Sequence, residues 1–445
     1  MTFQPDPHLL PHENLLRACA VSQHDEAARR AVDLALSAPD LDWKALALAS
    51  VRHGVMPHVA RHLNAFTNDP RIPAEFAACF ARMGRGIALR NRVLFRETAR
   101  LLRALEAASI GCLVLKGVGL ALTVYPDPAL RNFADIDILV EEADYEAAGE
   151  IAAQCGFVRD AIAAHPWQHH EAFIATCPED ILTDTVPHEY DPMLTPELLI
   201  RHRHEVSLEL HRGLFLRANG FMRDVDLAPF WEGSQAAALP DGTPMRVPSP
   251  EAQIVHLAAH AATHIFRKLL FGLDMARVIA TYREQIDWER VIALADRYEA
   301  GNDTYLLLDL AQSEFGAEAP AATLHRLRRE TDAGRSGPRL TPAHIFQAAQ
   351  KDQSAENLER LRRASNGWER LATAWHILFP PVPAMQRIYG AQPPSRIALY
   401  YLLRPFHLLL RQGRALLRRI RPQSRTALPE GEYERSVRLP VERSH

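Results

Sequence analysis

The stretch from Asp135 to Val140 reads Asp-Ile-Asp-Ile-Leu-Val, and this alternation constrains the fold more than any other feature of the chain. Side chains alternate faces along a strand at about 3.3 Å per residue, so Asp135 and Asp137 project from one face about 6.6 Å apart. The flanking Ile136 and Ile138 point the other way, which indicates a buried strand. Because isolated acids are expensive in such a strand, we expect the two carboxylates to share a cation. Oxygen ligands of this kind select Mg²⁺ or Mn²⁺.

A second strand and a glycine turn precede this one. Residues 111–115 are short, apolar and prone to form a strand, and they end at Lys116 and Gly117. A strand-to-helix turn of this kind aims backbone N–H groups at an anion. We therefore expect Lys116 and Gly117 to contact a phosphate, with the lysine acting as a point charge. Taken alone, the pair would also fit a surface lysine beside an ordinary turn glycine.

Three segments together resemble a known family, the polymerase-β-like nucleotidyltransferases, and within it a poorly characterised bacterial branch. The signature of that branch reads roughly L-K-G, then Y-x-D-P-x-L-R, then D-I-D-L-L-V. The matching segments here are residues 115–117, 125–131 and 135–140. Residues 206–211 resemble the family's strand that supplies a third carboxylate, here Glu209, where the wider superfamily usually has aspartate. The resemblance covers about residues 85–300.

The resemblance implies an α+β fold, with a small mixed-sheet core flanked by N- and C-terminal helical regions. It also implies a metal-dependent transfer of a nucleoside monophosphate from a nucleoside triphosphate to an acceptor hydroxyl, with release of pyrophosphate. Asp135, Asp137 and Glu209 would be the catalytic residues and would hold two Mg²⁺ (or Mn²⁺) ions. The residues implied to bind the triphosphate are Lys116, Gly117 and Arg131. The motifs leave open whether the acceptor is a small molecule, a sugar precursor, RNA or a protein.

Arg131 and Glu209 also have a second interpretation. Arg131 also fits a loop cap or an ion pair with Asp127. Glu209 also fits a surface acid on an edge strand. A glutamate at this position keeps open a protein that binds nucleotide without transferring it, as a regulatory or scaffold module.

A stripe of histidines forms a separate candidate. Three histidines recur every fourth residue and so lie along one helix face: His256, His260 and His264. They fit packed helix histidines, the wall of a substrate groove, or the zinc site of a metal-dependent hydrolase. A zinc site would need a further ligand of fixed geometry, and the sequence shows none nearby.

Composition divides the chain of 445 residues, which is long for one domain. The parts we predict are an N-terminal helical region at 1–105, the core at 106–247 with a loop insertion at about 160–204, a C-terminal helical domain at 248–380, and a basic amphipathic segment with a tail at 381–445. Lysine and arginine number 51 against 54 acids, which gives no argument for a nucleic-acid partner.

Five cysteines without a C-x-x-C pair fit a reducing compartment. The N-terminus lacks the pattern of a signal peptide, so we expect a cytoplasmic protein.

The composition changes near the C-terminus. Residues 370–429 contain no acid, and residues 396–425 carry eight arginines around apolar runs. Arg404, Pro405 and His407 interrupt these runs, which argues against a transmembrane helix. The segment fits peripheral contact with the inner membrane surface, or a basic helix packed on the acidic body of the same chain.

Overall fold

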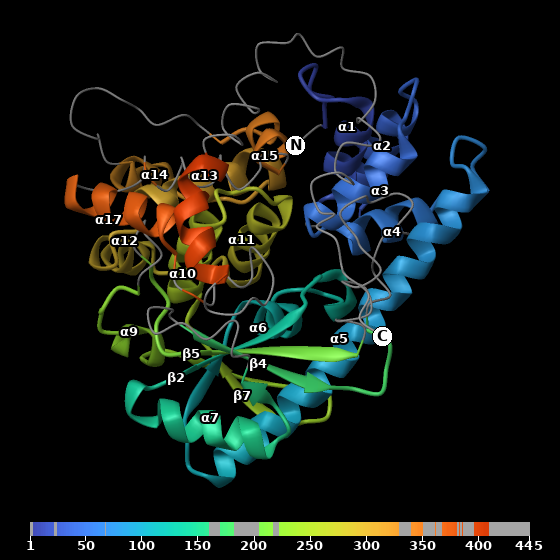
Figure 1. Cartoon of the computed structure of the whole chain (residues 1–445). Coiled ribbons are helices and arrows are strands. Elements are labelled where there is room, and N and C mark those ends of the chain that lie inside the picture. Colours follow the sequence, from blue (N-terminus) through green and yellow to red (C-terminus); the bar gives the residue numbers. More distant parts are fainter. Residues whose placement is uncertain are drawn as a thin grey trace, which may run out of the picture.

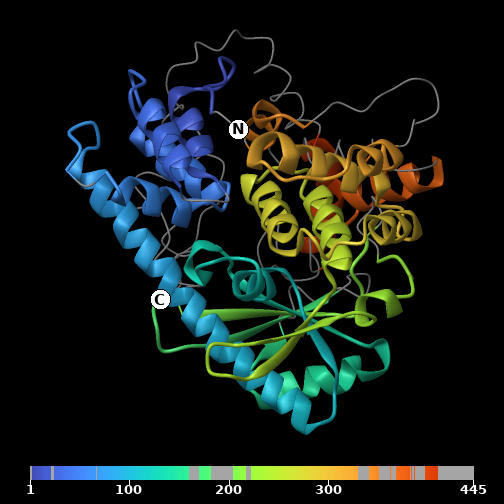
Figure 2. The ribbon, with the colours of Figure 1, turned by 180° about the vertical axis from the view of Figure 1, so that it is seen from behind.

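The computed structural model describes residues 3–21, 25–66, 68–159, 170–181, 204–216, 222–328, 340–349, 361, 367–380, 382, 385 and 396–408. Figure 1 shows one sheet between two sets of helices, with the N-terminal helices and a C-terminal helical region side by side above one face. Figure 2 shows the same arrangement from behind. The predicted α+β class, a mixed sheet with flanking helices, is confirmed.

Five helices make up the N-terminal region: α1 (Pro11–Cys19), α2 (Glu26–Leu36), α3 (Trp43–Arg52), α4 (Met56–Asn64) and α5 (Ala74–Ala107). Asp25 and Asp42 cap α2 and α3 by accepting hydrogen bonds from backbone N–H groups. With 34 residues, α5 is about 50 Å long. It runs from the N-terminal bundle to the far side of the sheet, so it belongs to both parts of the molecule (Figure 1).

The described part of the chain contains one sheet of five strands: β1 (Cys112–Val114), β2 (Asp135–Val140), β3 (Val158–Arg159), β4 (His170–Thr176) and β5 (Glu205–His211). Their order across the sheet is β1-β2-β5-β4-β3. The pairing of β2 with β5 is parallel, and the other pairs are antiparallel. The acid-bearing strand therefore lies next to the strand predicted to carry the third carboxylate.

The two faces of the sheet differ in character. Ile136, Ile138, Leu208 and Leu210 are buried in a core shared with α5 and with α7 (Tyr145–Gln154). Because side chains alternate along a strand, the acidic side chains face the other way, toward the helical regions. The short α6 (Lys116–Thr123) leaves β1 on this side, and η1 (Pro128–Leu130) follows it before β2.

The stretch 160–204 was expected to be an insertion or loop. Its described part contains a strand, β4, which pairs with β5 along its whole length. A neighbouring strand imposes this pairing, which the local composition does not reveal. The remainder of the expected insertion, residues 160–169 and 182–203, lies outside the described residues.

A small hairpin and a set of helices complete the fold. After α9 (Ala228–Trp231), the hairpin of β6 (Gln235–Ala238) and β7 (Pro244–Val247) leads to α10 (Pro250–Thr263), α11 (Leu269–Tyr282), α12 (Trp288–Arg297), α13 (Gly301–Phe315) and α14 (Ala321–Leu327). Ser249 caps α10. Two further helices are α15 (Pro342–Ala349) and α17 (Gly367–Leu378), and residues 396–408 are also helical. Within the described ranges, no helix is both long and apolar enough to cross a membrane.

The contact between α11 and α13 gives a first test of the packing. A Cβ on Gly272 of α11 would lie 2.6 Å from Cε2 of Phe315, so Gly272→Ala should lower the free energy of unfolding by about 1–3 kcal/mol through overpacking. Urea unfolding followed by circular dichroism measures the change. Gly367→Ala is the matched control, because no atom lies within 4 Å of its added Cβ, and its effect should stay within about 0.5 kcal/mol. Equal stability of the two variants would contradict this packing.

Candidate active site

The register of the parallel pair β2/β5 brings the predicted acids together. Asp137 lies opposite Glu209, and Asp135 lies opposite Ser207. Directly opposed residues share a face, so three carboxylates project from the same side of two neighbouring strands. Of the three, Asp137 is the most deeply buried, with a side chain only 2% exposed. The arrangement that the alternating pattern predicted for Asp135 and Asp137 is therefore present, and Glu209 lies beside them.

Lys116 lies at the start of α6, and its ammonium group is 2.7 Å from Oδ1 of Asp137. The backbone N–H of Leu115 donates to the carbonyl oxygen of Asp137, which joins the end of β1 to the same residue. Lys116 adopts a φ of 31°, a backbone conformation that a residue with a side chain rarely takes. Surrounding structure must hold such a strained residue in place, and strain of this kind is common at functional sites.

Two histidines that the sequence reasoning did not select also reach the carboxylates. Nε2 of His211 lies 2.9 Å from Oδ1 of Asp137 and 3.5 Å from Oε2 of Glu209. Nε2 of His170, on β4, lies 3.5 Å from Oε1 of Glu209. Alternation along β5 would have indicated His211, because it lies two residues after Glu209. The sequence carries no such signal for His170, because its strand lies in the stretch without periodicity.

The charges of the site shift one another's pKa values. Burial raises the pKa of Asp135 to about 7, and the neighbouring Asp137 and Glu209 add to the increase. Burial alone would also raise the pKa of Asp137, but Lys116 and His211 outweigh it and hold that pKa well below its usual range. Burial opposes the charge of Lys116, yet the three carboxylates raise its pKa above the ordinary value. The two aspartates therefore differ. The carboxyl of Asp137 is strongly ionised, whereas that of Asp135 titrates near neutral pH.

The other two predicted residues have additional structural roles. A Cβ on Gly117 would lie 3.0 Å from the Cβ of Phe133, so this position needs glycine for close packing. Arg131 donates to both carboxylate oxygens of Asp274 on α11, at 2.9 and 2.7 Å. Tyr125 also donates to Asp274, at 2.7 Å. Contact of Gly117 and Arg131 with a triphosphate stays a prediction, and the expected alternative partner of Arg131, Asp127, is replaced by Asp274.

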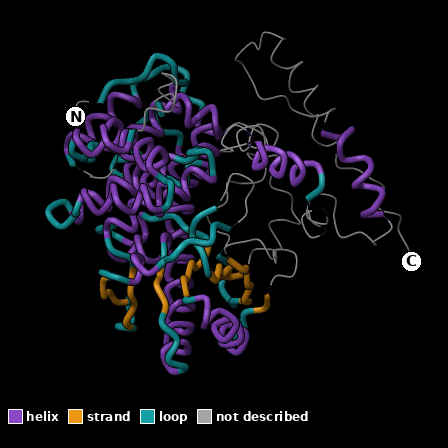
Figure 3. Tube along the Cα trace, turned by 90° about the vertical axis from the view of Figure 1, so that its left-hand side faces the viewer, coloured by secondary structure: helices purple, strands orange, loops and turns teal. Residues whose placement is uncertain are grey.

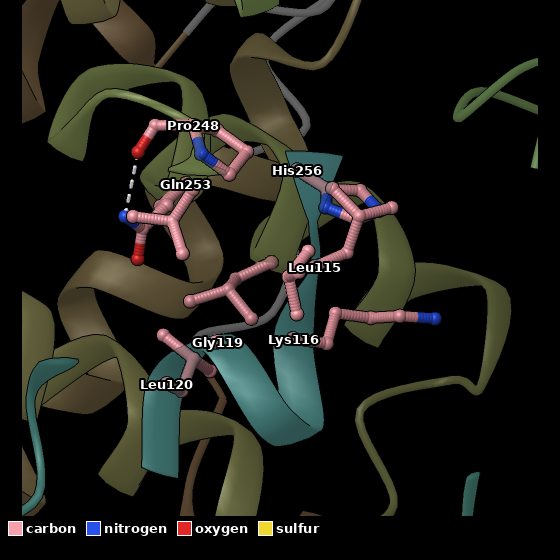
Figure 4. Close-up of a pocket in the computed structure, with 10 residues that line it drawn as sticks. Leu115, Lys116, Gly119, Leu120, Pro248, Gln253 and His256 are labelled. Atoms are coloured by element: carbon pink, nitrogen blue, oxygen red, sulfur yellow. Dashed lines mark hydrogen bonds between the residues drawn. The ribbon is translucent and has the colours of Figure 1, made fainter. Parts of the chain in front are cut away.

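The histidine stripe of α10 faces the same site. The charges of Lys116 and Asp137 act on His256 and His260, although burial is the main reason that both imidazoles have lowered pKa values, about 3 in the case of His256. Figure 4 shows Lys116 and His256 along the edge of a small pocket, with the Lys116 side chain directed away from Gln253. The stripe therefore lies close enough to Lys116 and Asp137 for their charges to act on it, and the groove interpretation stays a prediction.

Another cation approaches from α11. Lys268 directly precedes that helix, and burial lowers its pKa, while the charge of Asp135 acts in the opposite direction. In the turn before it, Ile265 and Phe266 have positive φ values of 50° and 52°. Lys268 was not predicted as a site residue, because only the tertiary fold brings residue 268 near residue 135.

The donor set fits a hard divalent cation. Three carboxylates converge here with one buried ammonium, and carboxylate oxygens are the protein ligands that Mg²⁺ and Mn²⁺ prefer. In the part of the chain that the structure describes, the group whose ligand atoms all lie within 4.8 Å of one another is His170, Glu209 and His211. The three histidines of the α10 stripe form no such group among these residues, which leaves the hydrolase interpretation without a metal centre there.

Comparison with known proteins agrees with this geometry. A family model described as an uncharacterised nucleotidyltransferase matches residues 39–316, which is more than half of the chain. A search of curated proteins finds no match. The matched range includes α5, the entire sheet and the helices up to α13, and therefore every residue of the site.

The raised pKa of Asp135 predicts a pH-dependent effect on stability. In EDTA at pH 8, Asp135→Asn should raise the free energy of unfolding by roughly 1–3 kcal/mol, because it removes a carboxylate that folding makes harder to ionise. The folded pKa of about 7 lies above the unfolded value near 3.8, so the gain should shrink as the pH falls from 7 toward 4. Thermal melts across this range test it, with the exposed Asp224→Asn as control. A gain that is independent of pH would contradict the assignment.

Proposed function

We propose that this chain, which belongs to the uncharacterised nucleotidyltransferase family, transfers a nucleoside monophosphate from a nucleoside triphosphate to an acceptor hydroxyl and releases pyrophosphate. One observation carries the proposal: the parallel register of β2 and β5 puts Asp137 beside Glu209, with Asp135 on the same face. Three carboxylates on one face of the sheet, next to a lysine at a helix start, would form a site for a triphosphate and its cations.

Each side chain has a distinct task in this reaction. Asp135, Asp137 and Glu209 would hold Mg²⁺ or Mn²⁺, and the bound ions would stabilise charge on the attacking and leaving oxygens. The side chain of Glu209 is more accessible than that of Asp137, 25% against 2% exposed. It is therefore suited to accept the proton of the acceptor hydroxyl. The hydroxyl oxygen forms a bond to the α-phosphorus as the bond to the β-phosphate oxygen breaks.

Lys116 links cation binding to phosphate binding. Its ammonium neutralises Asp137 at 2.7 Å, the position that a bound cation would also have to neutralise. With a cation bound at that carboxylate, the Lys116 ammonium would instead contact a phosphate oxygen as a point charge. Lys268, which directly precedes α11, would supply a second ammonium near Asp135 for the same polyanion.

The acceptor would enter along the wall formed by α10. Neutral histidines and Phe271 line this side, with the rings of His264 and Phe271 stacked at 6.1 Å. Such a wall suits an uncharged or aromatic group. A nucleotide-binding scaffold without transfer is the alternative to the reaction, and turnover separates the two. We do not propose a hydrolase centred on the α10 stripe.

Transfer of a labelled nucleotide is the direct test. The purified chain is incubated with each α-labelled nucleoside triphosphate, Mg²⁺ or Mn²⁺, and a cell extract as the source of acceptor. Asp137→Asn should abolish metal-dependent triphosphate binding in a folded protein. Glu209→Gln should lower kcat by about 10²-fold with little change in triphosphate affinity, because its role is concentrated in the transition state.

Glu205→Gln is the matched control, since Glu205 lies on the same strand but pairs with Thr176 at the far end of β5. It should keep wild-type turnover. Full turnover in folded Asp137→Asn would refute the assignment of the acids. Metal-dependent triphosphate binding without any labelled product would favour the scaffold alternative.

We also propose that the protein is cytoplasmic and attaches peripherally to the inner membrane surface. The five cysteines are free, which supports a reducing compartment. Two helices near the C-terminus expose apolar rows that recur at helical spacing: Trp368, Leu371 and Trp375 on α17, and Leu399, Leu402, Leu403 and Phe406 on residues 396–408. Figure 3 shows these helices to one side of the body. The arginine-rich residues 409–445 lie outside the described residues.

Vesicle binding tests this attachment. The double variant Leu402→Glu and Phe406→Glu should reduce binding to phosphatidylserine-containing vesicles by about 10-fold or more, because it puts charge on the apolar row. Higher salt should weaken the wild-type binding. Co-sedimentation gives both values, and Leu34→Glu, at an exposed leucine of α2, serves as control. Wild-type protein that stays in the supernatant would refute the proposal.

A further inference from the structure

The site contains a group of ligands that a nucleotidyltransferase core of carboxylates does not require. His170 lies directly opposite His211 in the antiparallel pairing of β4 with β5. Both imidazoles therefore project from the face that carries the acids, and Glu209 lies two residues before His211 on the same side. The ring centres of the two histidines are 4.9 Å apart. Two nitrogen donors and one carboxylate thus converge beside Asp137.

The spacing of these donors matches a metal coordination sphere. Nε2 of His170 and Nε2 of His211 each lie 3.5 Å from an oxygen of Glu209. Ligand atoms about 2.1 Å from a tetrahedral ion lie about 3.4 Å from one another, and those around an octahedral ion about 3.0 Å. All three ligand atoms lie within 4.8 Å of one another, so an ion between them would draw the groups closer together.

The surroundings leave one side of the group open. The side chain of His211 is 1% exposed and that of His170 is 17% exposed, while Glu209 is more accessible. A site with three protein ligands and an open direction is typical of metal centres that bind water or substrate in the remaining position. His211 also contacts Asp137 at 2.9 Å, so the group adjoins the two aspartates of β2.

We infer that His170, Glu209 and His211 form a mixed nitrogen–oxygen metal site that selects a divalent transition ion, such as Zn²⁺, Co²⁺ or Mn²⁺, over Mg²⁺. Imidazole nitrogen suits transition ions, whereas Mg²⁺ favours oxygen ligands in near-octahedral geometry. Asp135 and Asp137, with oxygen donors only, form the position for Mg²⁺ or Mn²⁺. The two positions are thus chemically different. The metal site itself is independent of the proposed reaction, and only its role as the second cation position rests on that proposal.

Metal binding in the absence of nucleotide tests the inference. Full-length protein freed of metal with EDTA is titrated with CoCl₂, ZnCl₂ and MgCl₂, using calorimetry for stoichiometry and affinity and visible absorption for the Co²⁺ complex. We expect one tight equivalent of Co²⁺ or Zn²⁺, with a visible spectrum typical of nitrogen ligation. His170→Gln should weaken this equivalent by about 10-fold or more and change the Co²⁺ spectrum, because a direct ligand is lost. Mg²⁺ affinity should not change.

His344→Gln, at an exposed histidine of α15, is the control for weak surface binding and should keep the tight equivalent. His211→Asn is a second variant, with its fold verified by circular dichroism because His211 is buried. Wild-type Co²⁺ affinity and spectrum in His170→Gln would overturn the inference.

The outcomes separate this inference from the proposed function. A tight, His170-dependent Co²⁺ site in a protein that never binds a triphosphate would support the metal site and refute the transfer reaction. Mg²⁺-dependent transfer with no such Co²⁺ site would support the reaction and refute the mixed ligand set.

Discussion

The buried ion pair between Lys116 and Asp137 is the interaction on which the site depends. Asp137 lies among apolar strand residues, and an unpaired charge there would cost several kcal/mol, on the order of 3–5 if its partner were removed. The pair also explains why Lys116 keeps a strained φ of 31°, because the end of β1 must bring its ammonium to β2. Under the proposed reaction, a cation bound at Asp137 would take the place of the lysine there, and a phosphate oxygen would become the new partner of Lys116. Cation binding and nucleotide binding would then be coupled.

A second buried ion pair fixes the helical region to the sheet. Arg131 lies a few residues before the acid-bearing strand. Both hydrogen bonds that it donates to Asp274 connect this segment to α11. The geometry is bidentate, which restrains orientation as well as distance. Because α11 starts just after Lys268, the same pair also holds that lysine near Asp135. The pair therefore fixes α11 to the segment that leads into the acid-bearing strand.

Local patterns predicted the parts of the site that lie close together in the sequence. Alternation identified β2 and the shared face of Asp135 and Asp137, and the turn after β1 identified Lys116. The partner of Arg131 lies 143 residues later, so no local pattern could distinguish Asp274 from the nearer Asp127. His170 was missed for a related reason. Its strand exists because β5 offers an edge to pair with, and its own residues lack the alternation that marks β2.

Three of the histidines around the site add no charge to it at neutral pH. Burial lowers the pKa of His256 to about 3 and those of His170 and His264 to about 4, so these imidazoles are neutral at pH 7. Neutral imidazoles neither attract nor repel a triphosphate by charge, and they keep a lone pair for hydrogen bonds or a metal. The charge of the site therefore depends on three carboxylates, the ammonium groups of Lys116 and Lys268, and His211. Burial opposes the charge of His211, but Asp137 and Glu209 outweigh it and raise its pKa. Under the proposed reaction, ionised Asp135 would add to the negative charge beside the phosphates, and the cations bound with the triphosphate would offset it.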